Sequence, residues 1–287
     1  MMRRDREIVQ DKLAEIVEKV PALDKRGTFT GLSWEEMIPV FDAVIELGRE
    51  GVAGLVAMVK DVDDGSDYKA RYVLHGLAQY AGRPGKEAPR AMLAGALAAQ
   101  LGGDRPKGAQ GYVARQLHVM GGPEAAPALG KLLADPDLSE YAAQALLAIR
   151  AGAAEQFRKA LPDLKGAARL TAIQALGVLA DSESVEALRK AAADESGDVR
   201  LSAGWALARI GDAGAVELAI KASGVVEPGY ERIKATSNAL LLAEKLLASE
   251  KKAEAAKIYG HLKETRTDAS EAYVRDAAQE GLARAGG

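Results

Sequence analysis

The sequence predicts an all-α fold, an alpha-alpha superhelix of about seven to eight antiparallel helix pairs. Three observations predict it. The segment over residues 199–212 returns over residues 274–287, with weaker copies between and before. Hydrophobic residues make up 48% of the chain but aromatic residues only 5%, so small aliphatic side chains must form the core. Apolar residues also recur at helical spacing, so each unit is expected to pack on its neighbours as in a solenoid.

Equivalent leucines mark the repeat units. They are Leu77, Leu117, Leu146, Leu176, Leu207, Leu240 and Leu282. Successive leucines lie 40, 29, 30, 31, 33 and 42 residues apart. The central intervals are regular, and longer outer intervals are typical of terminal units adapted to capping. We therefore predict an N-terminal helical cap or atypical first repeat over residues 1–50 and a repeat array over residues 51–287.

Each central unit is predicted to contain two helices. Residues 182–193 form the first helix of the clearest unit, residues 194–198 break it, and Val199 begins the second. The preceding unit follows the same plan, with helices over residues 153–160 and 168–179. In each second helix, apolar residues at i, i+3, i+4 and i+7 predict one buried face.

A helix is also predicted over residues 34–47, before the regular repeats. Ser33 precedes it as an N-cap, and Glu36 lies three residues later, which is the pattern of a capping box. Pro39 is expected to kink the first turns of this helix or to lie at its edge.

The run Val-Arg-x-x-Ala-x-x-Ala-Leu-x-x-Ile-Gly-Asp over residues 199–212 resembles the second helix of HEAT repeats. The resemblance is to the short bacterial form shared with phycobilisome-lyase-like proteins. It covers most of residues 51–287 and is strongest over residues 123–212. The longer HEAT pattern has a period of about 40 to 47 residues, so the chain departs from it. The resemblance implies a HEAT-like solenoid with a right-handed superhelix, in which second helices line the concave side.

The helix over residues 199–212 sorts its side chains onto two faces. The residues expected to face the core are Ala203, Ala206, Leu207 and Ile210. Leu201, Trp205 and Ala208 lie on a different face. The resemblance implies that this second face points to the concave surface.

One row of residues runs through the array at the Trp205 position, two residues before each marker leucine. Its members are His75, Arg115, Gln144, Gln174, Trp205, Asn238 and Glu280. A flanking row lies four residues earlier in each unit. Its members are Arg71, Gly111, Glu140, Leu170, Leu201, Lys234 and Asp276. We predict that the first six members of the main row, together with Arg71 and Lys234, bind a protein or peptide partner. The alternatives are that the row is solvated surface and that Trp205 packs between units.

Catalytic and metal-binding patterns are not found. The chain has no cysteine, which excludes disulfides, thiolate metal sites and thiol nucleophiles. No glutamate follows His75, His118 or His261, so the His-Glu pairs that a resemblance to HEAT-type di-iron hydroxylases would require are absent. Residues 61–67 look like a calcium loop, but their glycine is out of place and Tyr72 stands where a bidentate carboxylate is needed. We predict no metal, no cofactor and no enzymatic activity.

The charge balance limits the partners. The formal net charge is -3, so no overall attraction to phosphate backbones or anionic lipid is expected. No run of 18 apolar residues is present, so no membrane partner is predicted. The charged first residues lack the apolar stretch of a secretory leader, which predicts a cytoplasmic protein. A periplasmic or secreted protein is the alternative if a leader has been removed.

The sequence therefore favours a non-enzymatic protein interaction scaffold. The resemblance also allows a small-molecule or bilin lyase-like activity, a chaperone, or an enzyme similar to DNA alkylpurine glycosylases with HEAT-like repeats. A purely structural array that binds through its first helices is a further alternative. For that alternative, the charged first-helix residues are predicted to be solvated: Lys131, Lys159, Arg189 and Lys190. The oligomeric state is left open.

Overall fold

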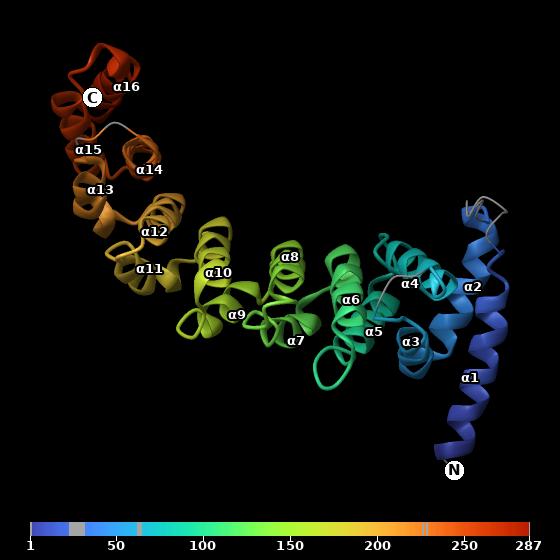
Figure 1. The fold of residues 1–287 in the computed structure, drawn as a ribbon. Coiled ribbons are helices and arrows are strands. Elements are labelled where there is room, and N and C mark those ends of the chain that lie inside the picture. The colour runs from blue at the N-terminus through green and yellow to red at the C-terminus, as the bar shows by residue number, and fades with distance from the viewer. Residues whose placement is uncertain (1, 23–31, 62–64, 226, 228, 287) are drawn as a thin grey trace. The chain divides into compact units, whose positions relative to one another are not determined.

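The computed structural model describes residues 2–22, 32–61, 65–225, 227 and 229–286. Within these ranges the chain is all-α, with sixteen helices and no strand (Figure 1). The helices follow one another as eight consecutive pairs, which confirms the predicted fold class. None of the described helices is long and apolar enough to cross a membrane.

The chain divides into two compact units, residues 1–156 and 157–287. The helices of the first unit are α1 (Met2–Glu18), α2 (Trp34–Glu46), α3 (Gly48–Ala57), α4 (Tyr68–Ala81), α5 (Glu87–Ala98), α6 (Lys107–Met120), α7 (Ala126–Gly130) and α8 (Ser139–Ile149). The helices of the second unit are α10 (Gly166–Val178), α11 (Val185–Ala191), α12 (Gly197–Ile210), α13 (Val216–Ser223), α14 (Tyr230–Ala248), α15 (Lys252–Thr265) and α16 (Ala272–Gly286). Helix α9 (Ala153–Ala160) contains the boundary. The separate boundary predicted at residue 50 stays a prediction.

Short 3₁₀ turns precede four of the helices. They are η1 (Pro123–Ala125), η2 (Ser182–Ser184), η3 (Ala213–Ala215) and η4 (Ala269–Glu271). The first helix predicted over residues 182–193 is therefore a 3₁₀ turn followed by the short α11.

In the first unit, helices pack on their second neighbours along the chain. Helix α4 contacts α2 and α6, and α6 also contacts α8. The odd-numbered helices form a second row, in which α3 contacts α1 and α5. This pattern of neighbour contacts is the one expected of stacked helix pairs.

The second unit repeats the arrangement. Helix α12 contacts both α10 and α14, and α14 also contacts α13 and α15. Small residues allow the even-numbered helices to approach closely. A Cβ atom on Gly177 of α10 would lie 2.8 Å from the Cα atom of Ala206 on α12. Small residues in place of aromatic ones therefore allow close contact between the even-numbered helices of this unit.

The predicted capping box at the N-terminus of α2 is confirmed. The Ser33 hydroxyl accepts from the backbone N–H of Glu36, and the Glu36 carboxylate accepts from the backbone N–H of Ser33. Hydrogen bonding of the Glu36 carboxylate with the Ser33 side chain and with the Ser33 backbone N–H lowers the pKa of Glu36. Pro39 lies inside α2 and its side chain is exposed. Helix α2 adds Phe41 to the core of the unit.

The buried face predicted for the helix over residues 199–212 is largely confirmed. Ala203, Ala206 and Leu207 are buried, whereas Ile210 is half-buried. The helix begins two residues before Val199. It ends at Gly211, whose φ of 79° is the left-handed conformation that glycine adopts most easily.

Three predictions about the packing are wrong. Ala208 is buried because α12 is covered on two sides, by α10 and by α14. Leu240 and Leu282 are only half-buried. In α14 the core positions belong instead to Ala239, Leu242, Ala243 and Leu246. Leu240 is therefore out of register with the first five marker leucines, which are all buried.

Candidate functional site

A groove of about 470 Å³ lies across α4, α6 and α8 in the first unit. We call it the first groove. Its lining residues are Arg71, His75, Tyr112, Arg115, Gln116, His118, Val119, Tyr141 and Gln144. Four of the eight residues predicted to bind a partner lie here, namely Arg71, His75, Arg115 and Gln144.

Arg115 lies between two tyrosine rings. Its guanidinium carbon is 5.4 Å from the ring centroid of Tyr112 and 5.7 Å from that of Tyr141. The Tyr112 hydroxyl donates to the backbone carbonyl of Arg71 at 2.6 Å, which fixes the first ring. Gly111 makes room for the second ring, because a Cβ atom there would lie 3.1 Å from the Tyr141 Cε2 atom. The guanidinium is thus held by cation–π contacts on two sides.

Arg71 has a structural role in the same groove. Its Nε atom lies 2.9 Å from the Asp67 carboxylate, and its Nη2 atom donates to the Lys60 carbonyl at 3.1 Å. The side chain is only 11% exposed and that of Asp67 only 1%. The charge of Arg71 is therefore balanced inside the protein, which the sequence did not predict.

His75 is part of a chain of polar groups. Gln116 donates from Nε2 to the Tyr112 carbonyl at 3.1 Å, so its Oε1 accepts from His75 Nδ1 at 3.0 Å. The other ring nitrogen, Nε2, lies 3.0 Å from Gln79 Nε2 and accepts its N–H. Both ring nitrogens of His75 are therefore engaged within α4 and α6.

Gln144 closes the far side of the first groove. Its Nε2 atom donates to the Glu140 carboxylate one turn earlier on α8, at 2.8 Å. Glu140 is exposed and does not line the groove. The lining itself contains two arginines, two histidines and no carboxylate.

A groove of about 530 Å³ lies across α10, α12 and α14 in the second unit. We call it the second groove. Its lining residues are Gln174, Val178, Leu201, Ser202, Trp205, Tyr230, Lys234, Ser237, Asn238 and Leu241. The other four predicted residues, Gln174, Trp205, Asn238 and Lys234, lie here. Glu280 and Asp276 are exposed on α16 and line neither groove.

Trp205 combines both alternatives that its position allows. Its ring packs on α10, because a Cβ atom on Gly177 would lie 2.8 Å from the Trp205 Cζ3 atom. The residue is nevertheless half-exposed and lines the second groove. Arg209 follows one turn later, with its guanidinium 5.7 Å from the ring centroid. Trp205 is therefore a fixed aromatic surface with one side open to the groove.

The marker leucines predict that Asn238 occupies on α14 the position that Trp205 occupies on α12. The structure does not place it there. Because the register of α14 differs, its side chain turns toward α12, where Nδ2 donates to the Leu201 carbonyl at 2.9 Å. Leu201 and Asn238 line the second groove and also a cavity on the other side of that hydrogen bond. These two residues therefore separate the second groove from that cavity.

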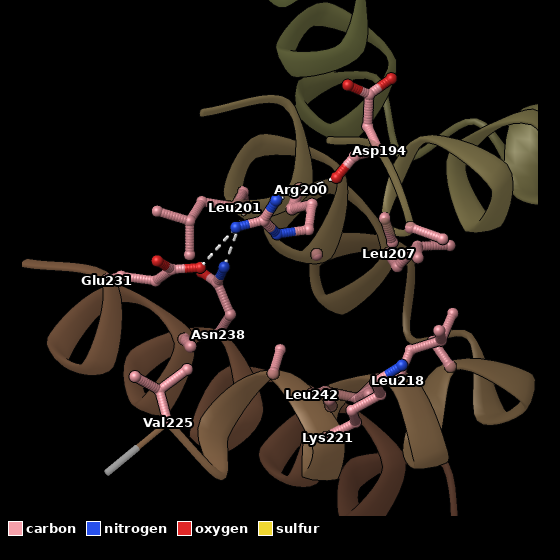
Figure 2. Close-up of a pocket in the computed structure, with 17 residues that line it drawn as sticks. Asp194, Arg200, Leu201, Leu207, Leu218, Lys221, Val225, Glu231, Asn238 and Leu242 are labelled. Atoms are coloured by element: carbon pink, nitrogen blue, oxygen red, sulfur yellow. Dashed lines mark hydrogen bonds and ion pairs between the residues drawn. The ribbon is translucent and has the colours of Figure 1, made fainter. Parts of the chain in front are cut away.

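That cavity has a volume of about 460 Å³ and lies among α11, α12, α13 and α14. We call it the second-unit cavity. Figure 2 shows its open centre, with Arg200, Leu201 and Leu207 on one side and Leu218, Lys221 and Leu242 on the other. Most of the lining is aliphatic. The apolar lining residues are Ala192, Ala193, Leu201, Gly204, Leu207, Ala215, Leu218, Ala219, Ala222, Val225, Ala235 and Leu242.

Most polar groups of the cavity are already paired. Arg200 Nη2 lies 2.8 Å from the Glu231 carboxylate, and Nη1 donates to the Asp194 carbonyl at 2.9 Å. Asp194 accepts from the backbone N–H of Ser196 and from Arg169, which lowers its pKa. Lys221 differs, because it is exposed and has no hydrogen-bond or ion-pair partner among the described residues.

Two ion pairs join successive helix pairs in the second unit. Arg158 on α9 pairs with Asp181, and Arg189 on α11 pairs with Asp212, at 2.7 and 2.6 Å in the second case. Arg189 was predicted to be solvated, and its side chain is 42% exposed although it is also paired with Asp212. Both arginines lie 23 residues before their partners. The common spacing is the sequence signal that could have revealed these pairs.

A third charged cluster connects α14 to the residues before α16. Arg232 donates to both oxygens of the Glu271 carboxylate, at 2.8 and 2.7 Å. Arg266 is fully buried and lies 3.4 Å from the same carboxylate. The hydrogen bonds from Arg232 lower the pKa of Glu271, and burial lowers the pKa of Arg266. The cluster belongs to the core of this unit.

The segment that looks like a calcium loop is only partly described, because residues 62–64 lie outside the described ranges. Asp67 accepts from the Lys60 backbone N–H at 2.7 Å, and Asp61 accepts from the Gly108 backbone N–H at 2.7 Å. The described carboxylates of this segment therefore fix the backbone. Across the described ranges, no group of three or more His, Cys, Asp or Glu side chains could hold a metal ion.

Comparison with known proteins gives a match to a protein family and matches to solved structures. No curated protein matches the chain. The solved structure of human deoxyhypusine hydroxylase in complex with glycerol shares 16% sequence identity over 98% of each chain, with a TM-score of 0.30. Residues 154–237 match the family described as HEAT repeats. This part of the chain, which includes α10 to α13, is therefore similar to HEAT repeats.

Proposed function

We propose that the protein is a non-enzymatic scaffold that holds an extended segment of a protein partner on its even-numbered helices. The observation that carries the proposal is the composition of the two grooves. Each combines a fixed aromatic surface with exposed polar groups, Tyr112 and Tyr141 in the first groove and Trp205 in the second. Aromatic residues and arginine are enriched among the residues that dominate binding energy at protein interfaces.

The HEAT repeats of the second unit support the same proposal, since repeats of this kind form extended binding surfaces. The charge of the chain also supports a protein partner. A net charge of -3 gives no general attraction to nucleic acid or to anionic lipid. We also propose that the repeats are of the short bacterial type shared with phycobilisome-lyase-like proteins.

Photocrosslinking in a cell lysate tests the proposal. A benzoylphenylalanine placed at Gln144 or at Val178, both exposed in a groove, should capture a defined protein. The same group at Lys257, exposed on α15 and outside both grooves, is the control. Capture at the groove positions should be lost when Arg115→Ala or Trp205→Ala is added. Equal capture at Lys257 would place binding on another face.

A second candidate function is the binding of a small amphiphile, a molecule with an apolar body and one carboxylate, in the second-unit cavity. Its aliphatic lining and the unpaired ammonium of Lys221 favour it. A cavity of this size lies within the roughly 300–1,000 Å³ range of small-molecule sites.

Calorimetric titration with dodecanoate tests this candidate. Lys221→Gln should weaken binding and Lys257→Gln should not, because only Lys221 lines the cavity. Ala219→Phe should abolish binding by filling the space. Binding that is indifferent to both changes would place the dodecanoate elsewhere.

A further inference from the structure

We infer that the first groove selects an acidic segment of its partner, and that Arg115 holds one of its carboxylates. The inference rests on the proposed function, because it names the chemistry of the segment that the first groove takes. Three features of the groove carry it: an unbalanced positive charge, a fixed guanidinium and an adjacent apolar surface.

The charge of the groove is unbalanced at Arg115. Arg71 is paired with Asp67, and both ring nitrogens of His75 already have hydrogen-bond partners. Arg115 makes no hydrogen bond or ion pair with any described residue, and its contacts are with aromatic rings. The nearby Glu140 carboxylate accepts from Gln144. A segment that brings a carboxylate therefore supplies the partner that Arg115 lacks.

The guanidinium is held in place before any partner arrives. Tyr112 is buried and hydrogen-bonded, and Tyr141 lies against Gly111, so both rings beside Arg115 are fixed. Contacts with ring faces leave the N–H groups of a guanidinium free to donate to a carboxylate in its own plane. Because the arginine is already ordered, binding costs less side-chain entropy than at a mobile arginine.

Val119 favours a bound segment that also carries an apolar side chain. It lies one turn after Arg115 on α6, lines the groove and is 42% exposed. Residues four apart on a helix are neighbours on its surface. An apolar side chain next to the bound carboxylate would cover Val119. The groove therefore fits a segment in which acidic and apolar residues alternate.

Nucleic acid fits the groove poorly. A phosphate backbone carries a charge at every nucleotide and is bound by several cations at once. The first groove offers one unbalanced arginine, and the chain has a net charge of -3. An acidic protein segment needs only one charged contact at this position.

Fluorescence anisotropy of labelled octapeptides tests the inference on the full chain. One peptide alternates glutamate with leucine, the second alternates glutamine with leucine, and the third alternates lysine with leucine. We expect the glutamate peptide to bind at least about tenfold more tightly than the other two. Arg115→Gln should weaken binding of the glutamate peptide by a similar factor and leave the affinity for the glutamine peptide unchanged. Arg83→Gln is the matched control, because Arg83 is exposed, lies over the Trp34 ring and is outside the groove.

The outcomes separate this inference from the proposed function. Equal affinity of the glutamate and glutamine peptides, or equal loss in Arg115→Gln and Arg83→Gln, would overturn the acidic preference. Displacement of the glutamate peptide by a single-stranded oligonucleotide at equal concentration would overturn the choice of a protein ligand. If none of the peptides binds, the acidic preference is wrong, and the crosslinking result at Gln144 alone decides whether the groove binds a protein.

Discussion

Gly281 shows how one absent side chain sets the packing of the last helix pair. It lies on α16 where the equivalent position of α12 is Ala206, and both positions are buried. A Cβ atom on Gly281 would overlap the ring of Tyr259 on α15. That ring is fully buried, and its hydroxyl donates to the Glu244 carboxylate at 2.5 Å. The absence of a side chain at Gly281 therefore leaves the space that the Tyr259 ring occupies.

We predict that Gly281→Ala lowers the free energy of unfolding by about 1–3 kcal/mol, because the ring of Tyr259 must shift in a packed core. Gly260→Ala is the matched control, since Gly260 lies inside the neighbouring α15 and a Cβ atom there meets nothing within 4 Å. This control should gain up to about 1 kcal/mol from helix propensity. Urea unfolding measures the free energy of unfolding of both variants. Equal effects of the two changes would contradict the packing role.

Leu176 and Gln174 separate core from surface on α10. Leu176 is fully buried, so Leu176→Ala should cost about 2–5 kcal/mol. Gln174 is exposed in the second groove and its one hydrogen bond, to the Ser202 hydroxyl, is 3.4 Å long. Gln174→Ala should therefore change stability by no more than about 0.5 kcal/mol. Urea unfolding of both variants checks this, and similar losses would contradict the assigned facing of α10.

Residue-level prediction from the sequence succeeds where the apolar pattern has a single phase. The capping residues Ser33 and Glu36 and the buried faces of α8, α10 and α12 are of this kind. It fails in α14 because residues 240–242 are all leucine, and a run of three cannot show which member faces the core. The structure assigns that role to Leu242.

At the scale of elements, one arginine of α9 and one of α11 are each joined to the N-cap residue of the next 3₁₀ turn. Asp212 is the clearer case, because its carboxylate binds Arg189 and also accepts from the Gly214 backbone N–H. The hydrogen bonds that Arg189 donates to the Asp212 carboxylate raise the pKa of Arg189. One side chain thus caps η3 and connects it to α11.

We predict that Asp212→Ala destabilises the second unit by about 1–2 kcal/mol, mostly through loss of the cap. Glu217→Ala is the control, because Glu217 is exposed on α13 and has no partner among the described residues. Hydrogen exchange should show faster opening of α11 and α13 in Asp212→Ala alone. Unchanged protection of both helices would show that the ion pair contributes nothing to the junction.

The grooves and the cavity differ in how far the sequence could predict them. A row of residues at a constant offset from buried leucines must lie on one helix face, so the first groove could be anticipated from His75, Arg115 and Gln144. The second-unit cavity depends on the distance between two helix pairs, which no spacing in the sequence encodes. Its lining of alanine and leucine has the same composition as the core.

At the scale of the whole molecule, carboxylates with lowered pKa values link stability to pH. They are Glu36, Glu87, Asp135, Asp194, Glu244, Asp268 and Glu271. The causes are hydrogen bonds from backbone N–H groups, from hydroxyls and from basic side chains. In the unfolded chain such groups titrate near about 4, so the folded state binds these protons less readily.

We predict that the free energy of unfolding falls as the pH drops below about 6.5, because burial lowers the pKa of His261, and falls further below about pH 5 as the pH drops through the lowered pKa values of the carboxylates. Urea unfolding at a series of pH values measures it. Glu271→Gln should reduce this pH dependence, and it should also cost about 3 kcal/mol at neutral pH because it leaves the buried Arg266 without its carboxylate. Glu217→Gln should change neither quantity. Stability that rises on acidification would contradict the sign.

The hydrogen bond between Asn238 and the Leu201 carbonyl separates the second groove from the second-unit cavity by the width of two residues. An occupant of either space touches the same pair. Their binding equilibria are then thermodynamically linked, and the linkage is reciprocal: a cavity occupant that strengthens or weakens binding in the groove is itself strengthened or weakened by the same factor. Under the proposed functions, a small molecule bound in the cavity would therefore change the affinity of the second groove for a protein segment.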